Sequence, residues 1–148
     1  MKLFLDAGNT RIKWQLRNAS EVIAEGAFSL DSFSSTMTNL ANYVLRQGAA
    51  LETVAVSSVL SEQDERDMEY SINALLGLSC RFATVKREFD GLQIAYEHIE
   101  NLGVDRWLIL LALHRRCRGV NSMVVGAGSA ITVDYLCADG RHCGGLIV

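Results

Sequence analysis

The chain has 148 residues, 49% hydrophobic and 21% charged, which is enough apolar material for the core of one ordinary domain. Its formal net charge of −3 provides no basic surface for a nucleic acid. The longest strongly apolar run, residues 107–113, is too short to span a bilayer, and the N-terminus lacks the pattern of a secretory signal. We therefore expect a cytoplasmic protein with no nucleic-acid or membrane partner.

The first part of the chain predicts an antiparallel meander. Residues 2–6 and 11–17 are expected to form two strands joined by a four-residue turn, and residues 20–28 a third strand. In the second strand apolar side chains alternate with polar and cationic ones, the period of two that is typical of a strand with one buried face.

The remainder predicts alternating helices and strands. Ser61 is expected to cap one helix and Gly77 to end it, whereas residues 86–102 show weak periodicity and are expected to form a loop with at most a helical turn. The other expected elements are a helix at 32–46 capped by Asp31 or Ser32, strands at 53–58 and 80–85, a helix at 104–118, and strands at 121–125, 130–136 and 142–148.

This order, β-β-β-α-β-α-β-α followed by β-β-β, indicates an α/β fold with a mixed sheet and flanking helices. The final run repeats the opening meander, and the turn at 126–129 resembles the turn at 6–10. Two copies of one half-fold facing each other would form a nucleotide cleft. Because the sequence stops within a strand, we expect the second domain to be incomplete.

The turn between the first two strands has groups that suit a nucleotide phosphate. Asp6 ends an apolar strand, Gly8 permits close approach of a ligand and Asn9 tolerates a left-handed backbone. Backbone N–H groups in such a turn can form an anion-binding nest, to which Thr10 adds a hydroxyl and Lys13 a cation. A carboxylate such as Asp6 can also hold Mg²⁺ beside phosphates.

Other interpretations of the glycine-rich turns are weaker. One alternative is that the first turn serves only the fold, because glycine and asparagine are common in hairpin turns for steric reasons alone. The phosphate-binding loop G-x-x-x-x-G-K-[ST] is absent. Residues 126–131 do not form a dinucleotide-binding motif, because Ile131 replaces its last glycine and a strand follows where a helix is required.

A second acidic turn, residues 103–106, begins a predicted helix. There Asp105 could orient an acceptor hydroxyl and take its proton, and free N–H groups together with Arg106 could bind a substrate carboxylate. The alternative is that Asp105 only stabilises the helix through its dipole.

The four cysteines form no C-x-x-C pair, and in a cytosolic protein we expect four reduced thiols. Zinc binding by His114 and Cys117 with residues 137, 142 and 143 is a remote alternative, because the spacing matches no common zinc module.

Taken in order, these motifs resemble type III pantothenate kinase, a family also called Bvg accessory factor. The matching segments are Asp6-Ala7-Gly8-Asn9-Thr10-Arg11-Ile12-Lys13, Gly103-Val104-Asp105-Arg106-Trp107, residues 127–134, Gly140-Arg141-His142 and Gly144-Gly145. Each turn alone is weakly specific, whereas the ordered set is specific and covers essentially the whole chain.

The resemblance implies an actin-like ATPase (ribonuclease H-like) fold, with a first domain at 1–119 and the opening strands of a second at 120–148. It implies ATP-dependent phosphorylation of pantothenate to 4'-phosphopantothenate, the first step of coenzyme A synthesis, by a homodimer that uses Mg²⁺ and a monovalent cation, K⁺ or NH₄⁺. Family members are substantially longer, so the 148-residue chain alone is expected to be inactive.

The resemblance also implies roles for individual residues. Asp105 matches the proton acceptor. The ATP-binding positions are Asp6, Ala7, Gly8, Asn9, Thr10, Arg11, Ile12, Lys13 and Ser129, and the pantothenate-binding positions are Tyr96, Gly103, Val104, Asp105 and Arg106.

Two positions depart from the family pattern. Gly126 stands where the family usually has the aspartate that binds the monovalent cation, so dependence on K⁺ is in doubt. Ser129 replaces a threonine that contacts ATP, but it keeps the hydroxyl. Gly126 leaves open a non-catalytic relative that binds nucleotide or pantothenate and acts through protein contacts. A third possibility is a kinase of another small molecule on the same fold.

Overall fold

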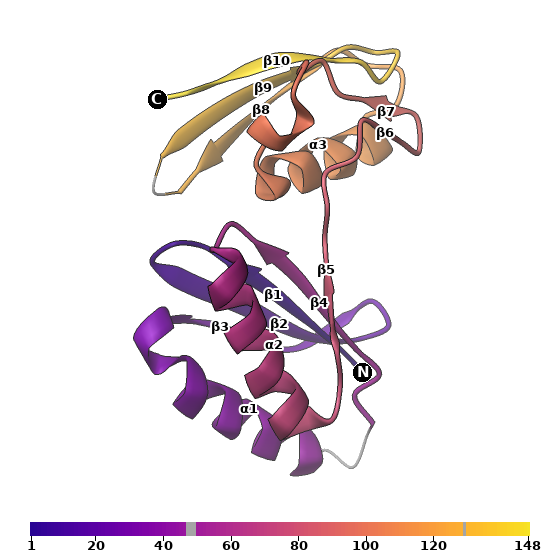
Figure 1. Cartoon of the computed structure of the whole chain (residues 1–148). Coiled ribbons are helices and arrows are strands. Elements are labelled where there is room, and N and C mark those ends of the chain that lie inside the picture. The colour runs from indigo at the N-terminus through magenta and orange to yellow at the C-terminus, as the bar shows by residue number, and fades with distance from the viewer. Residues whose placement is uncertain (47–49, 129) are drawn as a thin grey trace. The chain divides into compact units, whose positions relative to one another are not determined.

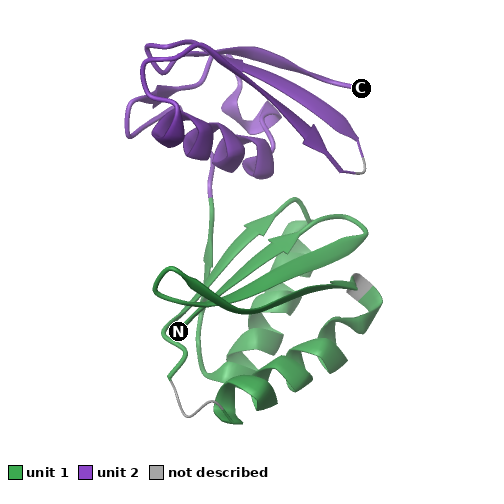
Figure 2. Cartoon of the chain, turned by 180° about the vertical axis from the view of Figure 1, so that it is seen from behind, with its two compact units in different colours: residues 1–83 green, residues 84–148 purple. Residues whose placement is uncertain are grey.

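The computed structural model describes residues 1–46, 50–128 and 130–148. The chain divides into two compact units, residues 1–83 and 84–148, shown in different colours in Figure 2. Each unit has its own hydrophobic core.

The first unit is a mixed sheet with two helices on one face (Figure 1). The strand order is β3-β2-β1-β4-β5, with the first three strands antiparallel and β4 and β5 parallel to β1. The strands are β1 (Lys2–Ala7), β2 (Arg11–Asn18), β3 (Glu21–Ser29), β4 (Thr53–Ser58) and β5 (Cys80–Phe82). The predicted meander is confirmed, and β5 is shorter than the expected strand at 80–85.

The two helices of this unit lie where the sequence predicts them. A 3₁₀ turn, η1 (Leu30–Ser32), leads into α1 (Phe33–Arg46), and α2 (Glu62–Leu76) follows β4. The backbone N–H of Asp64 donates to the Ser61 side chain, which caps α2 as predicted. Gly77 ends α2 with a φ of 67°, a left-handed conformation that favours glycine.

Alternation along β1 sets the two faces of this sheet. Leu3, Leu5 and Ala7 are buried in the core beneath the helices, whereas Phe4 and Asp6 on the opposite face are exposed. This alternation places Asp6 on the helix-free face.

The second unit packs one helix against an antiparallel sheet (Figure 1). The sheet order is β10-β9-β8, with β8 (Ser122–Ala127), β9 (Ile131–Leu136) and β10 (His142–Ile147). The helix α3 (Val104–Arg116) contacts β8 and β9, and its residues Trp107, Leu110 and Leu111 share a core with Leu136. A register shift interrupts the β9–β10 ladder between His142 and Gly145.

The segment predicted as a loop contains more structure than expected. It forms a hairpin of β6 (Glu88–Phe89) and β7 (Leu92–Gln93), followed by the 3₁₀ turn η2 (Ile99–Asn101). Asp90 and Gly91 both have positive φ, at 53° and 84°, as a two-residue hairpin turn requires. The Asp90 carboxylate accepts a hydrogen bond from Arg115 and also pairs with Arg118, and these contacts lower its pKa. The expected helix at 104–118 ends at Arg116.

The expectation of four reduced thiols is wrong for one pair, because Cys137 and Cys143 form a disulfide. The turn between β9 and β10 folds the chain back, with the Cys137 N–H donating to the Arg141 carbonyl, and so brings the two cysteines together. Cys80 and Cys117 are free, and burial, with a smaller contribution from Glu69, raises the pKa of Cys80 to about 11. The described part of the chain contains no group of three or more His, Cys, Asp or Glu placed to hold a metal ion.

None of the described helices combines the length and apolar character needed to cross a bilayer.

Candidate functional site

The first candidate segment is the hairpin turn between β1 and β2. The Gly8 N–H donates to the Arg11 carbonyl at 3.1 Å, closing the turn, and Ala7 pairs with Ile12 on the buried face. Neither Gly8 nor Asn9 has a positive φ. A β-carbon at Gly8 would lie 3.3 Å from the Arg11 carbonyl oxygen, so close packing of the turn, rather than a left-handed backbone, favours glycine here.

The exposed side chains of this hairpin present one carboxylate and one ammonium group. Asp6 lies opposite Lys13 in the β1–β2 register, with 3.8 Å between Lys13 Nζ and Asp6 Oδ2. Because both side chains are more than half exposed, this pair contributes little stability and leaves the lysine free to pair with another anion. Asn9, Thr10 and Arg11 are also exposed around the turn.

The neighbouring strand β4 was predicted as a strand but not as part of the candidate site. Ser57 lies beside Asp6 in the parallel β1–β4 register. The Ser57 hydroxyl is buried and has no hydrogen-bond partner among the described residues. Parallel strands end at the same edge of a sheet, which was the available signal that the Val-Ser-Ser end of β4 would meet Asp6.

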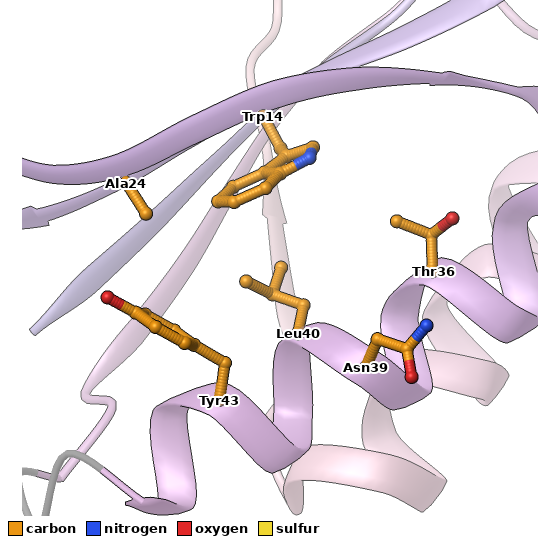
Figure 3. A pocket seen from close by; sticks show the side chains of 6 residues that line it. All are labelled: Trp14, Ala24, Thr36, Asn39, Leu40 and Tyr43. Carbon is orange, nitrogen blue, oxygen red and sulfur yellow. The ribbon is translucent and has the colours of Figure 1, made fainter.

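A cavity of about 290 Å³ in the first unit lies apart from these groups (Figure 3). Its lining is Trp14, Ala24, Thr36, Asn39, Leu40 and Tyr43. The Trp14 indole points from the sheet toward Leu40 of α1, whereas Lys13, the preceding residue of β2, is exposed. No charged side chain lines this cavity, so it is unsuited to a phosphate.

The second candidate segment is the start of α3. The Trp107 N–H donates to the Gly103 carbonyl in the first helical turn, and no side chain caps the helix. Asp105 is exposed, and its Oδ1 would lie 2.5 Å from a β-carbon at position 103. Glycine at 103 therefore leaves room for the Asp105 carboxylate beside the free N–H groups of the helix start.

Arg106 makes different contacts from those expected. Its side chain is 5% exposed and pairs with Asp134 of β9, with 2.9 Å from Nε to Oδ2 and 2.6 Å from Nη2 to Oδ1. The hydrogen bonds to Asp134 raise the pKa of Arg106. The Nε–Nη2 edge of the guanidinium, which could hold a substrate carboxylate with two hydrogen bonds, is therefore occupied by Asp134. Nη1 has no hydrogen-bond partner among the described residues.

Tyr96 belongs to the same cluster. Its hydroxyl accepts a hydrogen bond from Arg106 Nη2 at 3.1 Å, and its ring stacks on His142 with 5.6 Å between centroids. The Arg87 guanidinium donates to the carbonyls of Tyr96 and Glu97, which holds this part of the loop in place. The structure thus brings Tyr96 and Arg106 together, and both lie in the unit that contains Asp105.

The remaining candidate positions lie at the β8–β9 turn. A β-carbon at Gly126 would meet the Thr132 hydroxyl at 2.5 Å, so Thr132 occupies the space beside the glycine. Ser129 lies outside the described residues. Asp134 and His142 were not predicted as partners of Arg106, although a carboxylate at an inward position of β9 was a usable signal.

A sequence model of the family Type III pantothenate kinase matches residues 2–148. The chain belongs to the type III pantothenate kinase family. The type III pantothenate kinase of Saccharophagus degradans is 42% identical over 147 residues, covering 99% of this chain and 54% of the relative. That of Cellvibrio japonicus is 36% identical over 148 residues, covering 99% and 57%. The chain therefore spans about half the length of these pantothenate kinases.

Solved structures show the fold. A protein of Sinorhizobium meliloti described as a 2-dehydro-3-deoxygalactonokinase matches with a TM-score of 0.60 at 12% identity, covering 99% of this chain and 53% of its own. A Campylobacter jejuni protein described as a conserved Baf family transcriptional activator matches with a TM-score of 0.55 at 20% identity, covering 99% and 53%. The mixed sheet with flanking helices is thus the actin-like fold, as predicted.

Proposed function

We propose that the full-length protein transfers the γ-phosphoryl group of ATP to pantothenate, giving 4'-phosphopantothenate in the first step of coenzyme A synthesis. The observation that carries this proposal is the family match over residues 2–148. In support, the exposed Asp6–Lys13 pair and the uncapped start of α3 at Asp105 present groups that could serve such a transfer.

The phosphate turn would act by positioning and charge. Backbone N–H groups of residues 7–11, the Thr10 hydroxyl and the Lys13 ammonium group would bind the ATP phosphates, and the Ser129 hydroxyl would contribute from the second turn. The exposed Asp6 carboxylate fits Mg²⁺, which would neutralise charge on the β- and γ-phosphates.

The helix start would hold the acceptor. Asp105 would orient the pantothenate primary hydroxyl and take its proton, while Gly103, Val104, Arg106 and Tyr96 would line the pocket. The transition state of phosphoryl transfer is loose, so alignment of the hydroxyl contributes more than a strong base would.

The monovalent cation fits this chain poorly. Gly126 has no carboxylate to offer, and the nearby Thr132 hydroxyl is a single neutral ligand. We propose that the protein acts without a K⁺ site at position 126.

For the whole protein we propose a cytoplasmic homodimer, to be tested by light scattering of the full-length protein. We also propose a first domain at 1–119 and a second beginning at 120.

The testing experiment is ADP release by the full-length protein with ATP and Mg²⁺, with and without pantothenate and with and without K⁺. Turnover that requires both substrates supports the proposal. The absence of a carboxylate at position 126 favours one alternative, a non-catalytic relative, which would bind nucleotide or pantothenate without releasing ADP. ADP release with a different acceptor alone would identify another small-molecule kinase.

A further inference from the structure

In the second unit, Arg106 belongs to a closed ring of four side chains, each in contact with the next. The ring contains Tyr96 from the loop before α3, Arg106 from α3, Asp134 from β9 and His142 from β10. Arg106 donates to both oxygens of Asp134 and to the Tyr96 hydroxyl, His142 Nε2 lies 3.0 Å from Asp134 Oδ1, and Tyr96 stacks on His142. Side chains from two other segments, Tyr96 and Asp134, thus bind the Arg106 guanidinium, and His142 from a third holds both of them.

The ring is buried, and its protons are fixed by its chemistry. The side chains of Arg106, Asp134 and His142 are 5%, 3% and 0% exposed. Because an ionised carboxylate can only accept hydrogen bonds, His142 Nε2 must carry the proton that it shares with Asp134. His142 Nδ1 is buried and has no hydrogen-bond partner among the described residues. The hydrogen bond from Nε2 to Asp134 is therefore the one polar contact that the described residues give the His142 imidazole.

The backbone is shaped around the same ion pair. A β-carbon at Gly145 would collide with Asp134 Oδ1, with Arg106 Nη2 and with the Val133 carbonyl. Gly145 follows the register shift of β10, so the strand approaches the ion pair at a position where only glycine fits. The closeness of the strand leaves the guanidinium no room to rotate on that side.

The geometry points to Asp134 and His142 as positioning residues for Arg106. Asp134 holds one edge of the guanidinium, Tyr96 takes the second hydrogen of Nη2, and His142 fixes Asp134. Nη1 alone remains for a ligand, so Arg106 offers pantothenate one oriented donor whose charge Asp134 already balances. This inference rests on the proposed function. It assigns the orientation of Arg106 in the pantothenate pocket to two residues that are not among the predicted ATP- or pantothenate-binding positions.

The test uses the full-length protein and the steady-state constants for both substrates. We expect Asp134→Asn to raise the KM for pantothenate by about tenfold to a hundredfold, the usual effect of losing a partner that orients a binding group, while the KM for ATP stays within about twofold. The NH₂ group of asparagine is a donor and would face an N–H donor of Arg106, so one of the two hydrogen bonds between residues 134 and 106 is lost.

A pair of variants at position 142 separates positioning from packing. His142→Gln keeps an N–H donor near the position of Nε2 and is expected to retain the parent KM for pantothenate, whereas His142→Leu, which removes the donor, is expected to behave as Asp134→Asn does. Leu136→Val is the matched control, because Leu136 is buried on the same strand as Asp134, and it should lower the melting temperature without changing either KM.

Three results would overturn the inference: an unchanged KM for pantothenate in Asp134→Asn, equal rises in both KM values, or a His142→Gln variant as impaired as His142→Leu. Absence of turnover in the parent protein would refute the proposed function instead. In that case the Nε–H resonance of Arg106, measured by NMR in the parent and in Asp134→Asn, decides whether the ring holds the guanidinium. A protected resonance lost in the variant supports the ring, and one unchanged in the variant refutes it.

Discussion

At the scale of single residues, the sharpest prediction concerns Asp105. Its carboxylate is exposed beside the uncapped start of α3, and Asp105→Asn keeps its size while removing its basicity. We expect the kcat of the full-length enzyme to fall by about 10²–10⁴-fold with the KM for pantothenate nearly unchanged, since general base catalysis is of that size. Parent-like kcat in this variant would show that Asp105 only stabilises the helix.

Gly126 offers a gain-of-function test. We expect parent turnover to be the same in K⁺ and in Na⁺ buffers, because position 126 lacks a carboxylate. Gly126→Asp should make turnover depend on K⁺ once Thr132 rotates away from the new β-carbon. Gly126→Ala, which demands the same rotation but adds no ligand, is the control. K⁺-dependent parent turnover would contradict this prediction.

Cys80 should be chemically inert at neutral pH. Burial, with a smaller contribution from Glu69, raises its pKa to about 11, from a usual 9.0. The raised pKa lowers the thiolate fraction at pH 8 by about a hundredfold, and the thiolate is the reactive form. The alkylation rate of Cys80, followed by mass spectrometry of the folded protein, should therefore rise about tenfold per pH unit up to pH 11. A rate that levels off near pH 9 would be inconsistent with this environment.

At the scale of elements, local patterns predicted most of the fold. The alternation in β2, the cap at Ser61 and the glycine at position 77 are local signals, and β2 and α2 lie within a few residues of their expected places. The β6–β7 hairpin was missed because its strands are only two residues long, too short for periodicity. The Asp90-Gly91 dipeptide was the available signal, since both residues suit positive φ.

This hairpin turn supplies a stability prediction. Gly91 has a φ of 84°, and a β-carbon there would lie 3.1 Å from His114 Nε2 of α3. Gly91→Ala should destabilise the protein by about 1–2 kcal/mol from the backbone alone, with a further cost from the histidine contact. Gly119→Ala is the control, because its φ of 76° carries the same backbone cost with no atom within 4 Å. Equal melting temperatures for the two variants would rule out the His114 contribution.

The candidate site could be predicted only where it is contiguous in sequence. Residues 6–13 and 103–106 each form one short segment, so their motifs are visible without coordinates. Arg106 and Asp134 are 28 residues apart, and their pairing depends on how α3 packs against β9. For this reason the sequence suggested a substrate carboxylate as the partner of Arg106, whereas the structure supplies a protein carboxylate.

At the scale of the whole molecule, one face of the second unit is apolar and exposed. α3 covers the opposite face of the β8–β9–β10 sheet (Figure 1), and the strand registers place Met123 beside Tyr135 and Val133 beside Leu146 on the open face. Met123 and Leu146 are 64% and 68% exposed. Contiguous apolar patches of this kind drive association in water.

The chain spans 54% and 57% of the two pantothenate kinases compared above. Expressed alone, the 148 residues show whether the open face of the β8–β9–β10 sheet causes association. We expect concentration-dependent association in size-exclusion chromatography, reduced in the double variant Met123→Lys, Leu146→Lys because two charges would be buried at the contact. Tyr70→Lys is the matched control, since Tyr70 is 78% exposed on α2 of the other unit and its replacement should leave association unchanged. If the double variant associates as strongly as the parent chain, the contact lies elsewhere, and the exposed edges of β8 and β10 become the surfaces to test, since unpaired strand edges can also join chains.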